Sequence, residues 1–121
     1  MKVYVDVNVI YYILTANEQF GPRAKELVEE HYGRMITSAL TVWKLYILLL
    51  HSGAKLRTSQ VLEDLGVKVV ALTPKIIKMA EECEKLDFDD AIHYATMKAH
   101  GVGVILSNDR DFDKVDVKRV F

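Results

Sequence analysis

The sequence predicts an α/β fold, namely a single three-layer α/β/α domain with a mainly parallel central sheet. Short apolar runs such as Val3–Val5 and Val102–Leu106 have the length and composition of strands buried on both faces. Longer segments with apolar residues at helical spacing lie between these runs. No linker, repeat or low-complexity stretch interrupts the alternation, so we expect residues 1–121 to form one domain. Its strand–helix–strand crossovers should be right-handed.

The N-terminal half is expected to alternate short strands with helices. In order, the predicted elements are a strand over 3–5, helices over 7–17 and 21–33, a strand over 34–37 and a helix over 39–52. Pro22 follows Gly21 at a position that the first turn of a helix tolerates, and Gly33 is a stop signal. Thr37 or Ser38 is a good N-cap for the long helix, which Gly53 ends.

The C-terminal half repeats the pattern. The predicted elements are a helix over 55–65, a strand over 67–72, a helix from 74, a helix over 87–101, a strand over 102–106, a polar turn over 107–114 and an edge strand over 115–121. Thr73 followed by Pro74 is a typical helix start. The β-branched residues after Val67 favour a strand.

Composition excludes several classes of protein. The formal net charge is −1, so any contact with nucleic acid would be local rather than spread over a basic surface. Cys83 is the single cysteine, so no intrachain disulfide is possible, which fits a cytoplasmic protein. Cys83 itself is interpreted as a packing residue. Asp6 interrupts the N-terminal apolar run too early for a signal peptide, and the apolar stretch Leu45–Leu50 is too short to span a membrane.

The predicted helix over 39–52 is apolar on most of its faces. Such a helix is either buried on several sides or covers a partner. Trp43, Tyr46 or Leu50 could form a dimer face, but a plain core helix is the favoured interpretation.

Aspartates are concentrated at the ends of three predicted elements. Seven of the nine aspartates lie between Asp87 and Asp116, and Asp6 ends the first strand. Because ligands bind at the carboxyl edge of open α/β sheets, Asp6, Asp90 and Asp109 are expected to converge there. Converging carboxylates must take up protons or hold a cation, and their hard oxygens favour Mg²⁺ or Mn²⁺. Such a site supports in-line displacement at phosphorus, as in a nuclease or phosphatase.

Each polar residue also has a purely structural interpretation. Asp87 suits a helix N-cap, with Asp90 in the capping-box position, and Asp89 also suits the positive end of a helix. Asn8 either orients Asp6 or caps the first helix. His93 is interpreted as a core or helix-surface histidine, because zinc would require more nitrogen or sulfur ligands.

Three sequence blocks resemble the best-marked blocks of PIN domains. They read V-Y-V-D-V-N-V-I over 3–10, D-D-A-I-H-Y-A over 89–95 and L-S-N-D-R-D-F over 106–112. The chain is most similar to short prokaryotic PIN proteins of the VapC toxin type. The resemblance implies a Mg²⁺- or Mn²⁺-dependent ribonuclease, commonly a homodimer, held inactive by a small antitoxin. The roles it implies are metal-binding acids at Asp6, Asp90 and Asp109, an auxiliary acid at Asp111 and polar supports at Asn8 and Ser107.

The chain departs from the family pattern at one position. The family reads roughly T-S-x-L-T-x-x-E-L, whereas residues 37–45 read T-S-A-L-T-V-W-K-L, which places Lys44 where the second acid is expected. An inward Lys44 would pair with Asp6 or Asp90, leaving a one-metal site. An outward Lys44 would leave the acids free, with Asp89 able to contribute. The lysine could also contact the scissile phosphate.

Two functional hypotheses follow. The first is a metal-dependent endoribonuclease whose basic residues Lys44, Lys55 or Arg57 meet the RNA backbone. The second is a PIN-like binding or regulatory module that has lost catalysis because of Lys44. A phosphatase with an aspartyl nucleophile is a distant third, because the sequence after Asp6 lacks the second aspartate of that chemistry.

Overall fold

The computed structural model describes all residues 1–121 and contains one five-stranded sheet in the order β3-β2-β1-β4-β5. The strands are β1 (Val3–Val5), β2 (Met35–Ser38), β3 (Val67–Val70), β4 (Val104–Leu106) and β5 (Lys118–Val120). Every neighbouring pair is parallel. The predicted α/β fold with a parallel sheet is therefore confirmed.

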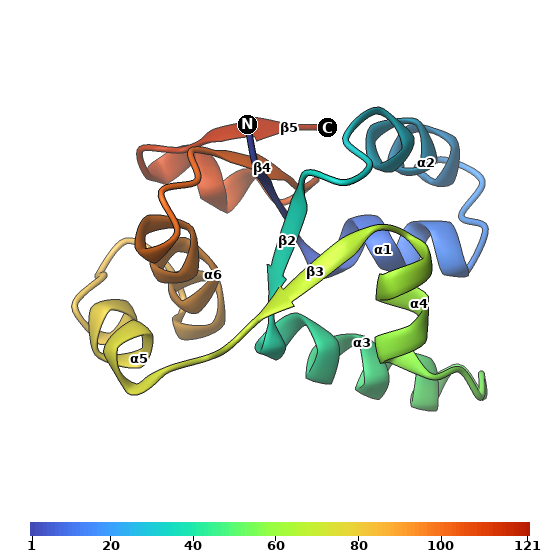
Figure 1. The fold of residues 1–121 in the computed structure, drawn as a ribbon, viewed down its shortest axis with the longest axis horizontal. Coiled ribbons are helices and arrows are strands. Elements are labelled where there is room, and N and C mark those ends of the chain that lie inside the picture. The colour runs from blue at the N-terminus through green and yellow to red at the C-terminus, as the bar shows by residue number, and fades with distance from the viewer.

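Helices cover both faces of the sheet (Figure 1). One face carries α1 (Val7–Leu14), α2 (Gly21–Glu30), α3 (Ala39–His51) and α4 (Thr58–Asp64), and the other carries α5 (Pro74–Glu81) and α6 (Phe88–Ala99). Because successive strand residues point to opposite faces, Val3 and Val5 join the first core whereas Tyr4 joins the second. The central strand β1 is thus buried on both sides, as its continuous apolar run predicts.

Several helices begin where the sequence indicates. Ser38 Oγ accepts a hydrogen bond from the Leu40 backbone N–H at the start of α3, and Thr73 Oγ1 accepts one from Ile76 at the start of α5. Other boundaries differ from the prediction. The first helix ends at Leu14 rather than at residue 17, because Ala16 adopts a left-handed backbone with φ 48°.

The remaining differences concern short elements. Both α4 and the strands β3 and β5 are shorter than expected, and the polar turn contains a 3₁₀ helix, η1 (Arg110–Lys114). Asp109 explains this helix, because its side chain accepts a hydrogen bond from Asp111 N and so caps the turn. Gly66, which follows α4, has φ 75° and packs beneath the ring of Tyr32, so no other residue fits easily there.

The starts of α6 and α1 test the structural interpretation of two polar residues. Asp87 occupies the N-cap position of α6, but its side chain makes no capping hydrogen bond. Asn8 lies inside α1, whose cap is Asp6, and its amide donates to the Asp6 carboxylate, so of the two alternatives for Asn8 the orienting one is confirmed. The capping interpretation therefore does not account for the carboxylate of Asp90, which is free to face the sheet edge.

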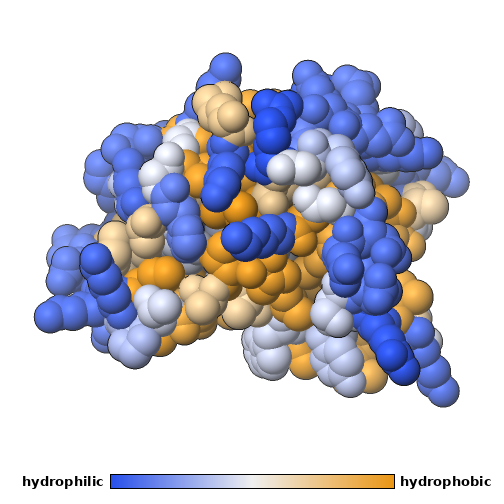
Figure 2. All heavy atoms as spheres, viewed as in Figure 1, coloured by the Kyte–Doolittle hydropathy of each residue, from blue (hydrophilic) through white to orange (hydrophobic).

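The interpretation of α3 as a plain core helix is also wrong for this chain. Only Thr41, Leu45 and Leu49 of the helix are buried. Trp43, Tyr46 and Leu50 are each more than half exposed. Figure 2 shows apolar and weakly polar residues gathered along the edge of the molecule where α3 runs in Figure 1. No helix of the chain is long and apolar enough to cross a membrane.

Candidate metal centre

The acidic residues gather where the strand order of the sheet reverses. The chain builds the sheet outward from β1 through β2 to β3, then returns to the other side of β1 with β4 and β5. Val5 and Leu106 are paired at the carboxyl ends of β1 and β4. The next residues, Asp6 and Ser107, therefore meet just beyond the sheet. This is the switch point at which open α/β sheets bind ligands.

Asp6 is held by donors from two elements. Its Oδ1 accepts a hydrogen bond from Val7 N at 2.7 Å, and its Oδ2 accepts bonds from Ser107 Oγ at 2.7 Å and from Asn8 Nδ2 at 3.3 Å. Ser107 Oγ in turn accepts a bond from the backbone N–H of Asp109 at 3.0 Å. The buried hydroxyl of Ser107 thus links one acid to the next.

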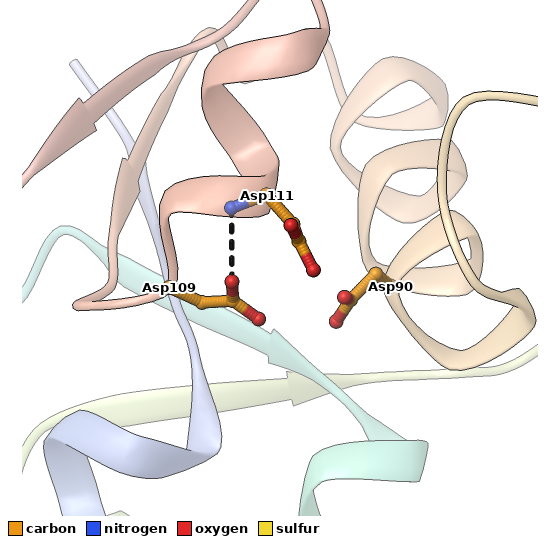
Figure 3. A group of neighbouring side chains, drawn as sticks. All are labelled: Asp90, Asp109 and Asp111. Atoms are coloured by element: carbon orange, nitrogen blue, oxygen red, sulfur yellow. Dashed lines mark hydrogen bonds between the residues drawn. The ribbon is translucent and has the colours of Figure 1, made fainter.

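Three carboxylates face one another beside this link (Figure 3). They are Asp90 from the first turn of α6, Asp109 from the loop after β4 and Asp111 from η1. One ligand oxygen from each lies within 4.8 Å of those of the other two. We call this group the acidic trio. The structure therefore brings Asp90 and Asp109 together with Asp111, the auxiliary acid that the resemblance implies. Asp6 lies outside the trio and is connected to Asp109 through Ser107.

The crowding of these acids has an electrostatic consequence. Burial, and then the negative charges of Asp89, Asp109 and Asp6, raise the pKa of Asp90 to about 7. A proton on Asp90 relieves the repulsion, and a divalent cation would relieve it further. The donor set consists of carboxylate oxygens drawn from separate elements with no histidine or cysteine among them. That chemistry fits Mg²⁺ or Mn²⁺ and does not fit a structural zinc.

Lys44 takes neither of the two positions considered for it. Its Nζ lies 2.6 Å from Oδ2 of Asp89, and its side chain is only 25% exposed. Burial disfavours the ammonium, but the bond to Asp89 and the attraction of Asp6 and Asp90 outweigh burial and raise the pKa of Lys44. Burial likewise opposes the charge on Asp89, yet Lys44 lowers the pKa of that carboxyl. Lys44 is therefore a fixed positive charge beside the trio, with Asp89 as its partner.

The other basic candidates lie elsewhere. Lys55 and Arg57 follow the C-terminal end of α3, where they line a surface pocket with Tyr46 and Leu50. Lys44 lies in the second turn of the same helix. The structure therefore does not bring Lys55 and Arg57 to the acidic trio.

The sequence allows the burial of one histidine but does not predict its contacts. His93 is completely buried, which confirms the core interpretation, but it also contacts Tyr4 and lies near Asp6. The sequence signal was its position three residues after Asp90, on the same side of α6.

A sequence model of the PIN domain matches residues 3–118. The chain belongs to the PIN domain family. The expected resemblance is thereby confirmed, and it covers nearly the whole chain. No curated protein sequence matches the chain.

Solved structures of toxins and toxin–antitoxin complexes share this fold. VapC20 of Mycobacterium tuberculosis, described as a sarcin-ricin loop cleaving toxin, superposes with a TM-score of 0.80 at 21% identity, covering 97% of this chain and 99% of that one. A toxin–antitoxin complex from Klebsiella pneumoniae gives 0.80 at 18% identity, covering 100% and 97%. VapBC2 from Rickettsia felis, bound to a promoter DNA fragment, gives 0.73 at 12% identity, covering 99% and 98%. At these identities the likeness establishes the fold of a VapC-type PIN domain.

Proposed function

We propose that this PIN domain is a metal-dependent endoribonuclease of the VapC toxin type. The observation that carries the proposal is the acidic trio, whose ligand oxygens lie within 4.8 Å of one another at the switch point of the sheet. Asp90, Asp109 and Asp111 would hold Mg²⁺ or Mn²⁺, and Asp6 would support them from behind or complete the shell. When bound, such an ion lowers the pKa of a coordinated water and stabilises the negative charge that develops on the phosphodiester in the transition state of cleavage.

Other residues of the chain would position the acids and the RNA. Ser107 fixes Asp109 relative to Asp6 through its hydroxyl, and Asn8 donates to the same carboxylate. Lys44 supplies a positive charge beside the trio that can attract the phosphate of an RNA strand as a point charge. Asp89 keeps this ammonium in place.

The test is an RNA cleavage assay with Mg²⁺ or Mn²⁺ on structured and single-stranded RNA. The natural chain should cleave, and Asp90→Asn should cleave at least about 100-fold more slowly. The exposed control Asp64→Asn, at the end of α4, should cleave normally. Unchanged metal-dependent cleavage by Asp90→Asn would show that the assignment of the site is wrong.

A second function is favoured by one observation, the Lys44–Asp89 ion pair of 2.6 Å. A fixed cation beside the trio weakens divalent-ion binding by repulsion, so the chain would be a PIN-like binding or regulatory module without turnover. Lys44→Glu decides between the two. If the natural chain does not cleave RNA but Lys44→Glu does, the result supports the binding or regulatory module. Robust cleavage by the natural chain, abolished by EDTA and by Asp6→Asn, excludes it.

Protein partners are part of the proposal. Similar structures include toxin–antitoxin complexes, which supports a small antitoxin as a partner of this chain. The exposed Trp43, Tyr46 and Leu50 lie at positions i, i+3 and i+7 of α3 and so share one helix face. Such a face supports an interface, and we propose a homodimer formed through it.

A further inference from the structure

A buried histidine lies directly behind the acidic edge of the sheet. The Nδ1 of His93 lies 2.5 Å from the hydroxyl oxygen of Tyr4. Its Nε2 is buried without a hydrogen-bond partner, 3.9 Å from Oδ1 of Asp6. Buried polar atoms without partners are rare, because they lose hydration with no compensating bond. Whether Nε2 carries a proton therefore determines whether His93 attracts or repels the Asp6 carboxylate.

The contacts of Tyr4 decide which ring nitrogen carries the proton. Burial disfavours the charged imidazolium and lowers the pKa of His93, and the neutral imidazole has one N–H. The Tyr4 hydroxyl accepts a bond from Ser38 N at 3.2 Å. The buried Thr41 hydroxyl has no other partner and also faces Tyr4 as a donor, which leaves the Tyr4 proton to be donated to Nδ1. Nε2 then carries the ring proton and faces the negative carboxylate. The opposite tautomer would set a lone pair of Nε2 against Asp6, which is repulsive in a buried site.

Asp6 has an acceptor position for this N–H. An ionised carboxylate offers about four lone-pair positions. Oδ2 accepts bonds from Ser107 and Asn8, whereas Oδ1 accepts only the bond from Val7 N. The distance of 3.9 Å is measured to this less occupied oxygen. It is about 1 Å longer than the usual N–H···O separation, so the N–H faces Oδ1 as an electrostatic contact and not as a full hydrogen bond.

We infer that His93 is a positioning residue for Asp6, held in its Nε2–H tautomer by Tyr4. The inference rests on the proposed function, because it assigns His93 to the support of the metal centre. A connected series of contacts leads from His93 to Oδ1 of Asp6, from Oδ2 of Asp6 to Ser107 Oγ, and from Ser107 Oγ to the backbone N–H of Asp109. Asp109 is a member of the acidic trio, so the orientation of Asp6 is transmitted to the trio.

The first measurement is the tautomer itself, by long-range ¹H–¹⁵N NMR of the natural chain in EDTA at pH 7.5. We expect His93 to show the Nε2–H pattern and Tyr4→Phe to lose or mix it, while exposed His100 stays unchanged in both. An Nδ1–H or imidazolium pattern at His93 in the natural chain overturns the inference. This measurement needs neither RNA nor metal, so it is independent of the nuclease assignment.

The second measurement is Mn²⁺ binding by calorimetry, with Mn²⁺ alone as the probe. Mutation of groups that orient metal ligands typically weakens metal affinity by about 10- to 100-fold. We expect His93→Leu to weaken Mn²⁺ binding about 10-fold and His93→Gln, whose amide N–H reaches the same region as Nε2, to restore most of it. His100→Leu, at the end of the same helix, should bind normally.

The outcomes separate this inference from the proposed function. The positioning role is overturned if the natural chain, His93→Leu and His93→Gln bind Mn²⁺ with equal affinity. It is also overturned if His93→Leu and His93→Gln weaken Mn²⁺ binding equally. If His93→Leu fails to fold, the Mn²⁺ affinities of His93→Gln and Tyr4→Phe are compared instead. The positioning role predicts that only Tyr4→Phe weakens Mn²⁺ binding. Failure of the natural chain to bind Mn²⁺ overturns the metal-dependent function, while the tautomer still decides how His93 faces Asp6.

Discussion

The ammonium nitrogen of Lys44 on α3 lies 2.6 Å from a carboxylate oxygen of Asp89 on α6, so a single ion pair joins helices from opposite faces of the sheet. The pair lies beside the acidic trio, and its two residues are 45 positions apart in sequence. The ammonium of Lys44 thereby favours the ionised form of Asp89, while its neighbour Asp90 faces the trio. Two adjacent aspartates therefore have different surroundings and different proton affinities.

The first prediction concerns the energy of this ion pair. The Asp89 side chain is 47% exposed, so solvent screening limits the gain. We expect a double-mutant cycle of Lys44→Met and Asp89→Asn to give a coupling of about 0.5–1 kcal/mol in urea unfolding. The coupling should shrink in 1 M salt. A cycle on the exposed Arg23–Glu26 pair serves as the control and should give less. A coupling of zero would contradict a fixed position for Lys44.

The second prediction concerns pH and the metal-free protein. Asp90 has a pKa of about 7 in the folded chain against an ordinary value of 3.8, so the folded state binds more protons than the unfolded state between these values. Stability contributed by this group is therefore present below about pH 4 and is lost as pH rises through 7. In EDTA, Asp90→Asn should be more thermostable than the natural chain at pH 8 and gain little at pH 5. Parallel pH profiles of the two proteins would refute the raised pKa.

The third prediction concerns metal binding and stability. A ligand that binds only the folded state stabilises it by about 2.7 kcal/mol at 100 times its Kd. Mn²⁺ should raise the melting temperature of the natural chain at pH 8 by several degrees, and less at pH 5, because protons compete for Asp90. EDTA should reverse the shift and Asp109→Asn should remove it. An equal shift in Asp109→Asn would mean that the ion binds elsewhere.

The fourth prediction concerns Ser107. Its buried hydroxyl donates to Asp6 and accepts from Asp109 N, so Ser107→Ala leaves two buried polar groups without this partner. We expect a loss of about 1–3 kcal/mol in urea unfolding, together with weaker Mn²⁺ binding. Ser59→Ala, on exposed α4, should change neither quantity. A neutral Ser107→Ala would show that the link between Asp6 and Asp109 is dispensable.

The fifth prediction concerns the exposed face of α3. Tyr46→Glu and Leu50→Asp should shift a dimer to monomer in analytical ultracentrifugation without lowering the melting temperature of the monomer, since both side chains are more than half exposed. Glu63→Lys, at an exposed position of α4, changes the charge of another helix and should leave the mass unchanged. If the natural chain is monomeric at high concentration, the homodimer is contradicted and the exposed face of α3 remains available to an antitoxin.

Local patterns in the sequence determined the elements and their order. The continuous apolar run Val3–Val5 predicted a strand buried on both faces, and the caps Ser38 and Thr73 marked two helix starts that the structure confirms. The helix and strand limits near Leu14, Asp64 and Val70 were less predictable, because the backbone of a few residues decides where an element stops.

Only the tertiary structure decided which polar groups meet. The sequence indicated that Asp6, Asp90 and Asp109 lie near one sheet edge, because parallel strands place their carboxyl ends together. It could not show that η1 turns Asp111 into the trio while Asp6 is occupied by donors from Val7, Ser107 and Asn8.

The same limit applies to Lys44 and His93. Sequence alone left Lys44 between an inward and an outward position, and it gave no sign of the contact between His93 and Tyr4. These partners come from elements 45 and 89 residues apart. Periodicity and caps reflect interactions within a few residues, whereas contacts at such separations depend on how helices pack across the sheet, which is why they became visible only in the folded chain.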